Sequence, residues 1–262
     1  MEREFERLYE QNYRRLYTMA FRLTGNREDT EDVLQNAFLN AYKSWGSFRG
    51  ESSHFTWLYR ITLHTAQRSM KKERRLHVTT YAEEHQLTER DVYGVINQAG
   101  YCDDDYLVER VRQSCLQMFM NCMPRRYRTV YALRCILGFS VAETAEIMEI
   151  SPEAVKVYLH RSRKISRDHF EGRCSLIHPG APCNCRAFAA YLKASGKTGL
   201  LLNLEAAAEE EKEAAETFRR EVAEVREIQR LYETRILPEP FPDFLEKIRN
   251  LMKQESFRLL DA

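Results

Sequence analysis

Glycine and proline are scarce in this sequence, which contains 10 and 7 of them among 262 residues. Because both residues interrupt regular structure and mark turns, their scarcity and a charged fraction of 30% favour a helical, soluble protein. A hydrophobic content of 44% is enough for packed cores, and the length allows one large domain or two or three small ones.

The sequence also lacks any long apolar run. No stretch of about 18 apolar residues and no secretory leader pattern occurs, so we expect a cytoplasmic protein without a membrane span. The cysteines number seven, which is odd and argues against a disulfide framework. Four of them are scattered singly and are expected to be buried apolar thiols: Cys102, Cys115, Cys122 and Cys135.

Signals of catalysis are missing as well. Gly196-Lys197-Thr198 has no upstream glycine at the spacing of a phosphate-binding loop, so we exclude that kind of nucleotide site. No nucleophile and base, and no pair of carboxylates, stand in a pattern typical of catalysis. The chain is therefore not expected to be an enzyme.

The most informative stretch that is present runs from Phe139 to Lys164 and predicts two short helices joined by a tight turn. Ser151 is placed to cap the second helix, and Pro152 suits its first position, where a missing N–H costs nothing. This layout is typical of a helix-turn-helix that enters the DNA major groove, the alternative being a buried hairpin with a solvated basic face. The outer face of the second helix carries Lys156, Tyr158, His160, Arg161 and Lys164.

Three amphipathic helices are predicted before this stretch, because apolar residues recur there at helical spacing. The second of these helices has an acidic side, whose carboxylates either complement the helix dipole or meet a basic partner. The predicted ranges are 4–24, 27–43 and 54–75.

The loop between the second and third predicted helices carries Trp45, Phe48 and Arg49. These side chains form either a hydrophobic plug or the wall of a pocket that stacks a splayed base. In the helix that follows, aromatic residues are interleaved with cations such as Arg60 and Arg68. That pattern suits either a packed core or a DNA strand lying across the helix.

Further along, residues 76–106 are predicted to be an irregular, solvated linker with a short helix at 89–98. Helices at 107–122 and 125–137 then complete a four-helix domain around the helix-turn-helix.

Two segments carry a family resemblance. They are DTEDVLQNAFLNAYKSWGSFRGESSHFTWLYRIT, residues 29–62, and PRRYRTVYALRCILGFSVAETAEIMEISPEAVKVYLHRSRK, residues 124–164. They resemble, in order, the core-binding and −10 segment and the −35-reading domain of extracytoplasmic-function (ECF) bacterial sigma factors, a subfamily of the sigma-70 type. The resemblance implies a sigma factor that directs core RNA polymerase to specific promoters. The implied architecture is all-α, with two small helical domains at 1–75 and 107–172, the linker at 76–106 and a helical C-terminal extension at 173–262.

The resemblance also implies roles for residues at matching positions. Docking on the clamp of the largest polymerase subunit is assigned to Asp29, Asp32, Gln35 and Phe38. Capture of a flipped −10 base and its strand is assigned to Phe48, Arg49, Ser52, Trp57, Arg60, His64, Arg68 and Lys71. Contact with the −35 duplex is assigned to Arg125, Arg126, Ser151, Glu153, Ala154, Lys156, Val157, Tyr158, Arg161 and Lys164.

The sequence departs from the family pattern in both DNA-reading parts. His64 stands where many members have asparagine, and Val157-Tyr158 replaces a small polar residue followed by arginine. The promoter sequence therefore cannot be transferred from the family. The resemblance also implies an anti-sigma factor as a further partner.

Beyond residue 170 the resemblance ends, and three cysteines and a histidine fall within twelve positions: Cys174, His178, Cys183 and Cys185. These ligand types suit a Cys₃His zinc site, but their spacing is not that of paired C-x-x-C motifs. A thiol redox pair and a metal-free, reduced loop are the alternatives.

The rest of the extension predicts a short helix at 186–192 and two amphipathic helices, at 200–236 and 244–260, whose apolar stripe needs a partner surface. One hypothesis is that this extension regulates the DNA-facing domains through its metal or thiol state. The rival for the whole chain is a stand-alone helix-turn-helix regulator with a metal- or redox-sensing C-terminal module. The segment at 29–62 discriminates, since such a regulator has no use for an acidic helix followed by an aromatic and arginine loop.

Overall fold

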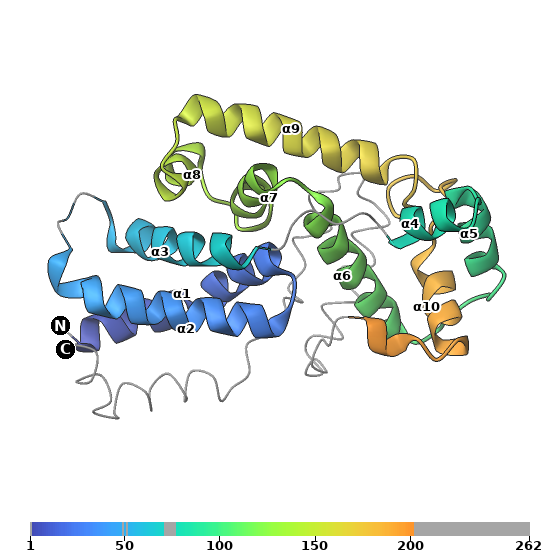
Figure 1. Ribbon diagram of the computed structural model, residues 1–262, viewed down its shortest axis with the longest axis horizontal. Coiled ribbons are helices and arrows are strands. Elements are labelled where there is room, and N and C mark those ends of the chain that lie inside the picture. Colours follow the sequence, from blue (N-terminus) through green and yellow to red (C-terminus); the bar gives the residue numbers. More distant parts are fainter. Residues whose placement is uncertain (1, 49, 51, 71–76, 202–262) are drawn as a thin grey trace.

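The computed structural model describes residues 2–48, 50, 52–70 and 77–201 (Figure 1). Within these residues the chain is helical, and its strand-type pairing is limited to an isolated parallel bridge between Cys174 and Cys183. The predicted all-α architecture is confirmed. The α-helices are α1 (Glu2–Thr24), α2 (Arg27–Ser44), α3 (His54–Ser69), α4 (His77–Glu84), α5 (Glu89–Asn97), α6 (Asp105–Cys122), α7 (Arg125–Tyr131), α8 (Val141–Met148), α9 (Pro152–Phe170) and α10 (Cys185–Ala194).

The first three helices pack on one another through a row of aromatic rings on α1. Phe5, Tyr9, Tyr13 and Tyr17 recur every four residues, so they share one face of the helix, and all four are buried. Phe38 of α2 lies between the first two rings, at centroid distances of 5.3 Å from Phe5 and 4.9 Å from Tyr9. Burial of each such ring stabilises the fold by about 1.5–3 kcal/mol.

The helix-turn-helix has the predicted form. Ser140 caps α8 in a capping box with Glu143, and Ser151 accepts a hydrogen bond of 3.1 Å from the backbone N–H of Ala154, with Pro152 opening α9. Glu149 ends α8 in the left-handed region, at φ 54°. Residues other than glycine rarely adopt this conformation, but it is common at the residue that ends a helix, and here it forms the turn between α8 and α9.

The segment at 77–97 differs from the irregular linker that we predicted. It forms α4 and α5, and the short helix predicted at 89–98 is confirmed as α5. Thr88 caps α5 in a capping box with Asp91. Its apolar residues Val92 and Ile96 are buried, in a small cluster against which Phe188 of α10 packs. The linker is therefore ordered by contact with the C-terminal extension.

One continuous hydrophobic core joins α1–α3 to α6–α9. Arg22 of α1 donates buried hydrogen bonds of 2.9 Å and 3.3 Å to the side chains of Gln113 and Gln117 on α6. Arg128 of α7 donates one of 3.1 Å to the Leu23 carbonyl. In Figure 1, α8 lies beside α3.

None of the described helices combines the length and the hydropathy that a membrane crossing requires. The helices predicted at 200–236 and 244–260, and the end of the helix predicted at 54–75, lie outside the described residues.

Candidate nucleic-acid interface

The outer face of α9 is open. Val155, Leu159 and Ser162 are buried on the inner side, whereas Lys156, Arg161 and most other predicted groove residues are exposed. Val157 is 47% exposed, which is unusual for an aliphatic side chain on a helix that has an apolar side elsewhere. The predicted residues that share this exposure are Ser151, Glu153, Lys156, Val157, Arg161 and Lys164, while Ala154 and Tyr158 are half-buried.

Two phenols position the arginines around this face. Arg126 of α7 lies 3.4 Å from the hydroxyl of Tyr158, and Arg161 lies 3.2 Å from the hydroxyl of Tyr127. The two rings meet edge to face at 5.8 Å. Neutral phenols leave the charges of both guanidinium groups uncompensated, so the surface stays cationic and suits phosphate.

Arg125 lies apart from the other predicted groove cations. It donates a hydrogen bond of 2.5 Å to the carbonyl of Met70, the residue that caps the C-terminus of α3. Its side chain therefore links the two helical groups in this conformation.

The predicted −10 residues of α3 are not open in the same way, because α8 covers part of them. Arg60 donates a hydrogen bond of 3.0 Å to the Glu146 carbonyl and lies 3.4 Å from the Glu149 carboxylate. His64 lies 3.1 Å from the same carboxylate. Thr56 lies 3.3 Å from the Glu146 carboxylate. The two glutamates of the α8 end thus engage side chains of α3 that were predicted to contact the −10 strand.

An aromatic corner stands at the other end of α3. Phe48 lies 4.2 Å from the His54 ring and 5.6 Å from Trp57, and Trp45 lies 4.6 Å from His54. Stacked rings of this kind are what a flipped base needs. The sequence reasoning missed His54, although its place at the start of a helix beside an aromatic loop was a usable signal.

The remaining predicted −10 residues are placed less centrally. Ser52 is half-buried and Arg68 is exposed. Arg49 and Lys71 lie outside the described residues.

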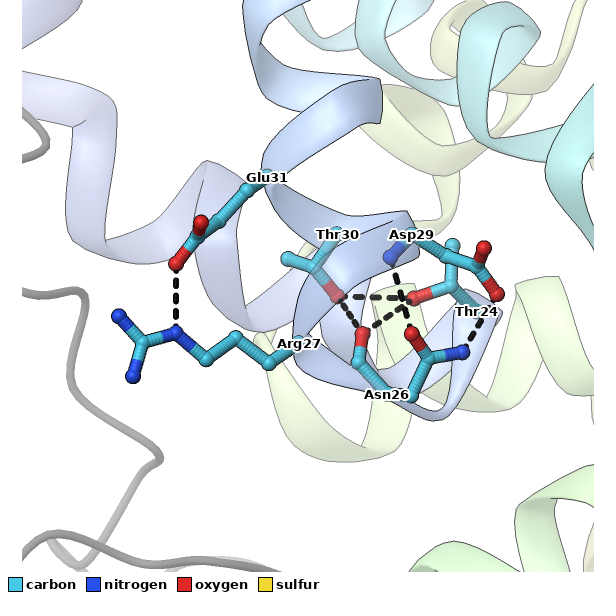
Figure 2. Close-up of polar contacts among 6 residues, drawn as sticks. All are labelled: Thr24, Asn26, Arg27, Asp29, Thr30 and Glu31. Carbon is cyan, nitrogen blue, oxygen red and sulfur yellow. Dashed lines mark hydrogen bonds and ion pairs between the residues drawn. The ribbon is translucent and has the colours of Figure 1, made fainter.

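Figure 2 shows the start of α2 with Asp29, one of the predicted polymerase-facing carboxylates. Asn26 caps the helix by accepting a hydrogen bond of 2.9 Å from the Asp29 N–H, and its amide also bonds the Asp29 carboxylate. Arg27 pairs with Glu31 at 2.6 Å. Asp32 is exposed and Gln35 is half-buried. An acidic surface therefore flanks this helix end.

The assignment of Phe38 to that surface is corrected by the structure. Its side chain is 1% exposed and is packed among the α1 rings, so it supports α2 from inside. The helical periodicity that places Leu34, Phe38 and Ala41 on one side explains this position, since all three are buried.

The four predicted metal ligands differ in backbone setting and in exposure. Cys174 and Cys183 are paired in the backbone bridge, and Cys185 is the first residue of α10. His178 is exposed. In the part of the chain that the structure describes, no three His, Cys, Asp or Glu side chains stand close enough to hold a metal ion as they are placed.

Comparison with known proteins agrees with this division of surfaces. The Sigma-70 region 2 model matches residues 8–76, and the Sigma-70 region 4 model matches residues 113–165. The ECF RNA polymerase sigma factor SigW of Bacillus subtilis is 32% identical over 154 residues, which cover 58% of this chain and 81% of SigW. SigX of the same organism is 29% identical over 65% of this chain and 86% of SigX.

A solved structure of CnrH in complex with the cytosolic domain of CnrY covers 65% of this chain and 90% of CnrH, with 22% identity and a TM-score of 0.46. That overall similarity is low.

The order of regions 2 and 4 defines a two-part transcription factor of the sigma-70 class. The chain belongs to the ECF RNA polymerase sigma factors. A stand-alone helix-turn-helix regulator is not favoured, since region 2 is present.

Proposed function

We propose that this sigma factor reads the promoter through two surfaces, of which one is exposed in this conformation and the other is partly covered by α8. In this proposal the α9 face binds the −35 duplex, and the aromatic corner with Arg60 and His64 holds the −10 strand. The open cationic face of α9 carries the proposal, because Lys156, Arg161 and Lys164 are exposed on the side opposite to the buried stripe. Lysine and arginine contacts of this kind set the register on phosphates, and few side chains remain to read bases.

Core RNA polymerase is the proposed partner of the acidic surface at the start of α2. Asp32 is exposed and Asp29 lies beside it near the start of α2, where carboxylates suit a basic docking surface. The protein would act in the cytoplasm and by binding alone, with the chemistry of transcription supplied by the polymerase.

The −10 surface must open before it binds DNA. Phosphate and carboxylate compete for the same cations, so Glu146 and Glu149 have to leave Arg60 and His64 when a strand arrives. Because α8 belongs to the −35 domain, this movement separates the two DNA-reading parts. Separation is also what two distant promoter elements on one duplex require.

The test is promoter-directed transcription by a bacterial core RNA polymerase supplied with the full chain and a library of random upstream sequences. We expect the selected templates to share two motifs at a fixed spacing. Lys156→Ala with Arg161→Ala should abolish selection of the upstream motif, and Lys193→Ala, an exposed lysine on α10, serves as the matched control. Failure to bind core polymerase, or initiation without any shared motif, would contradict the proposal.

A further inference from the structure

Four thiols lie where separate hydrophobic clusters meet. Cys174 belongs to the main core, and Cys115 packs against that core from α6. Cys183 packs against the small cluster of Ala82, Val92, Tyr93 and Ile96, and Cys185 against the cluster of Cys102, Leu107, Val111, Ala189 and Leu192. The thiols therefore stand at the junction of the −35 domain, the linker helices and the C-terminal extension.

The backbone already fixes two of these thiols as neighbours. The Cys183 N–H donates to the Arg173 carbonyl at 2.8 Å, and the Ser175 N–H donates to the Cys183 carbonyl at 3.0 Å. This is the parallel bridge between Cys174 and Cys183, in which paired residues point to the same side. Cys185 follows two residues later, as the first residue of α10.

Cys115 approaches the same region from α6. Burial raises the pKa of Cys115, and the charges of Cys183, Cys185 and Cys174 raise it further, in that order. Burial also raises the pKa of Cys185, to which Cys183 and Cys174 add. Cys115 and Cys185 are thus influenced by the charges of the same two thiols, Cys174 and Cys183.

Donors are arranged around the sulfurs as they are around metal-bound thiolates. The backbone N–H groups of Leu176 and Ile177 both donate to the Cys174 sulfur, and the Tyr93 hydroxyl bonds the Cys183 sulfur. The charge of the buried Arg112 guanidinium lowers the pKa of Cys174 and Cys185, while Glu109, which pairs with Arg112, raises that of Cys185. Hydrogen bonds and positive charge of this kind stabilise the negative charge of a thiolate cluster.

The two smaller clusters need such support. They contain five and four buried residues, which is too little apolar area to hold helices together on its own. A metal ion that joined these sulfurs would tie α6, the loop after α9 and the start of α10 together. Four thiolates in a tetrahedron are the donor set that zinc prefers.

We propose that Cys115, Cys174, Cys183 and Cys185 form a zinc site that fastens the linker and the C-terminal extension to the −35 domain. The described side chains do not yet gather as ligands, so closure of the site requires rotation of the thiols about backbones that are already in place. His178 of the predicted Cys₃His set is left out. It is exposed, and its ring lies over Gly180, where an added Cβ would be 3.5 Å from the ring.

The test measures metal content of the full chain expressed without added zinc, by mass spectrometry of the metal. We expect about one zinc ion per chain, loss of most of it in Cys115→Ser, and retention in His178→Ala. Cys122→Ser is the matched control, since this half-buried cysteine lies on the same helix and outside the proposed set. Zinc retained in Cys115→Ser but lost in His178→Ala would overturn the proposal, as would a metal-free chain.

Cobalt substitution keeps the proposal testable if the serine variant fails to fold. Cys115→His retains four ligands, so its sulfur-to-cobalt charge-transfer bands should fall by about a quarter, and His178→Ala should leave them unchanged. Absence of these bands in the wild-type protein would refute the site. A disulfide between Cys174 and Cys183 in freshly purified protein would refute it too. Neither result would bear on promoter reading, because the proposed site shares no residue with the α9 face.

Discussion

The two helices that we propose to contact DNA, α9 and α3, differ in what their cationic side chains bond. On α9 the guanidinium of Arg161 bonds the Tyr127 hydroxyl, and Lys156 is exposed. On α3 Arg60 and His64 both contact the carboxylate of Glu149. In this conformation the proposed −35 surface on α9 is exposed, whereas the proposed −10 surface on α3 is partly covered by the end of α8.

The largest expected effect comes from removing the open cations. Lys156→Ala with Arg161→Ala should weaken holoenzyme binding to a selected promoter duplex by about 30- to 900-fold, because each of the two charged contacts with phosphate contributes about 1–2 kcal/mol. Fluorescence anisotropy over a range of salt concentrations would measure the loss. The slope of affinity against salt should also fall by about two counterions. An unchanged slope would show that α9 does not contact phosphates.

A smaller, opposite effect is expected from uncovering α3. Glu149→Gln removes the charge that pairs with Arg60 and His64 and keeps the side-chain size, so affinity of the free sigma factor for −10 single-stranded DNA should rise about 3- to 10-fold. The gain should disappear when Arg60→Ala is added. Glu84→Gln, which changes an exposed carboxylate on α4, is the control. Equal affinities of all these proteins would show that the pairing does not limit access to α3.

The parts of this comparison differ in how far the sequence predicts them. The α9 face follows from local signals, since Ser151 and Pro152 define the helix start and periodicity separates its two sides. The cover on α3 could not be predicted in this way. It joins Arg60 to Glu146, 86 positions apart, and no periodicity or spacing relates such distant residues.

Phe38 and Cys115 show the same difference between what local periodicity predicts and what depends on tertiary packing. Phe38 could have been placed correctly, since its periodicity with Leu34 and Ala41 already marks the apolar side of α2. The influence of the cysteines after α9 on the pKa of Cys115 could not be predicted, because it depends on how α6 packs against α10.

The smallest expected effect concerns an ion pair that stabilises the fold and lies outside the proposed DNA-binding surfaces. Arg173 lies 2.6 Å from Glu89 and links the loop after α9 to α5. Its hydrogen bond lowers the pKa of Glu89, so this pair stabilises the fold above the unfolded pKa of that carboxyl, and the contribution is lost as the pH falls through the lower, folded pKa. Glu89→Gln should therefore reduce the free energy of unfolding at neutral pH by about 0.5–1 kcal/mol, with the difference from wild type shrinking in acid. Urea unfolding at several pH values would measure it, and −10 strand affinity should not change. If Glu89→Gln instead increased strand binding, as Glu149→Gln is expected to do, the ion pair of Glu89 could not be distinguished in function from the contacts of Glu149 with Arg60 and His64.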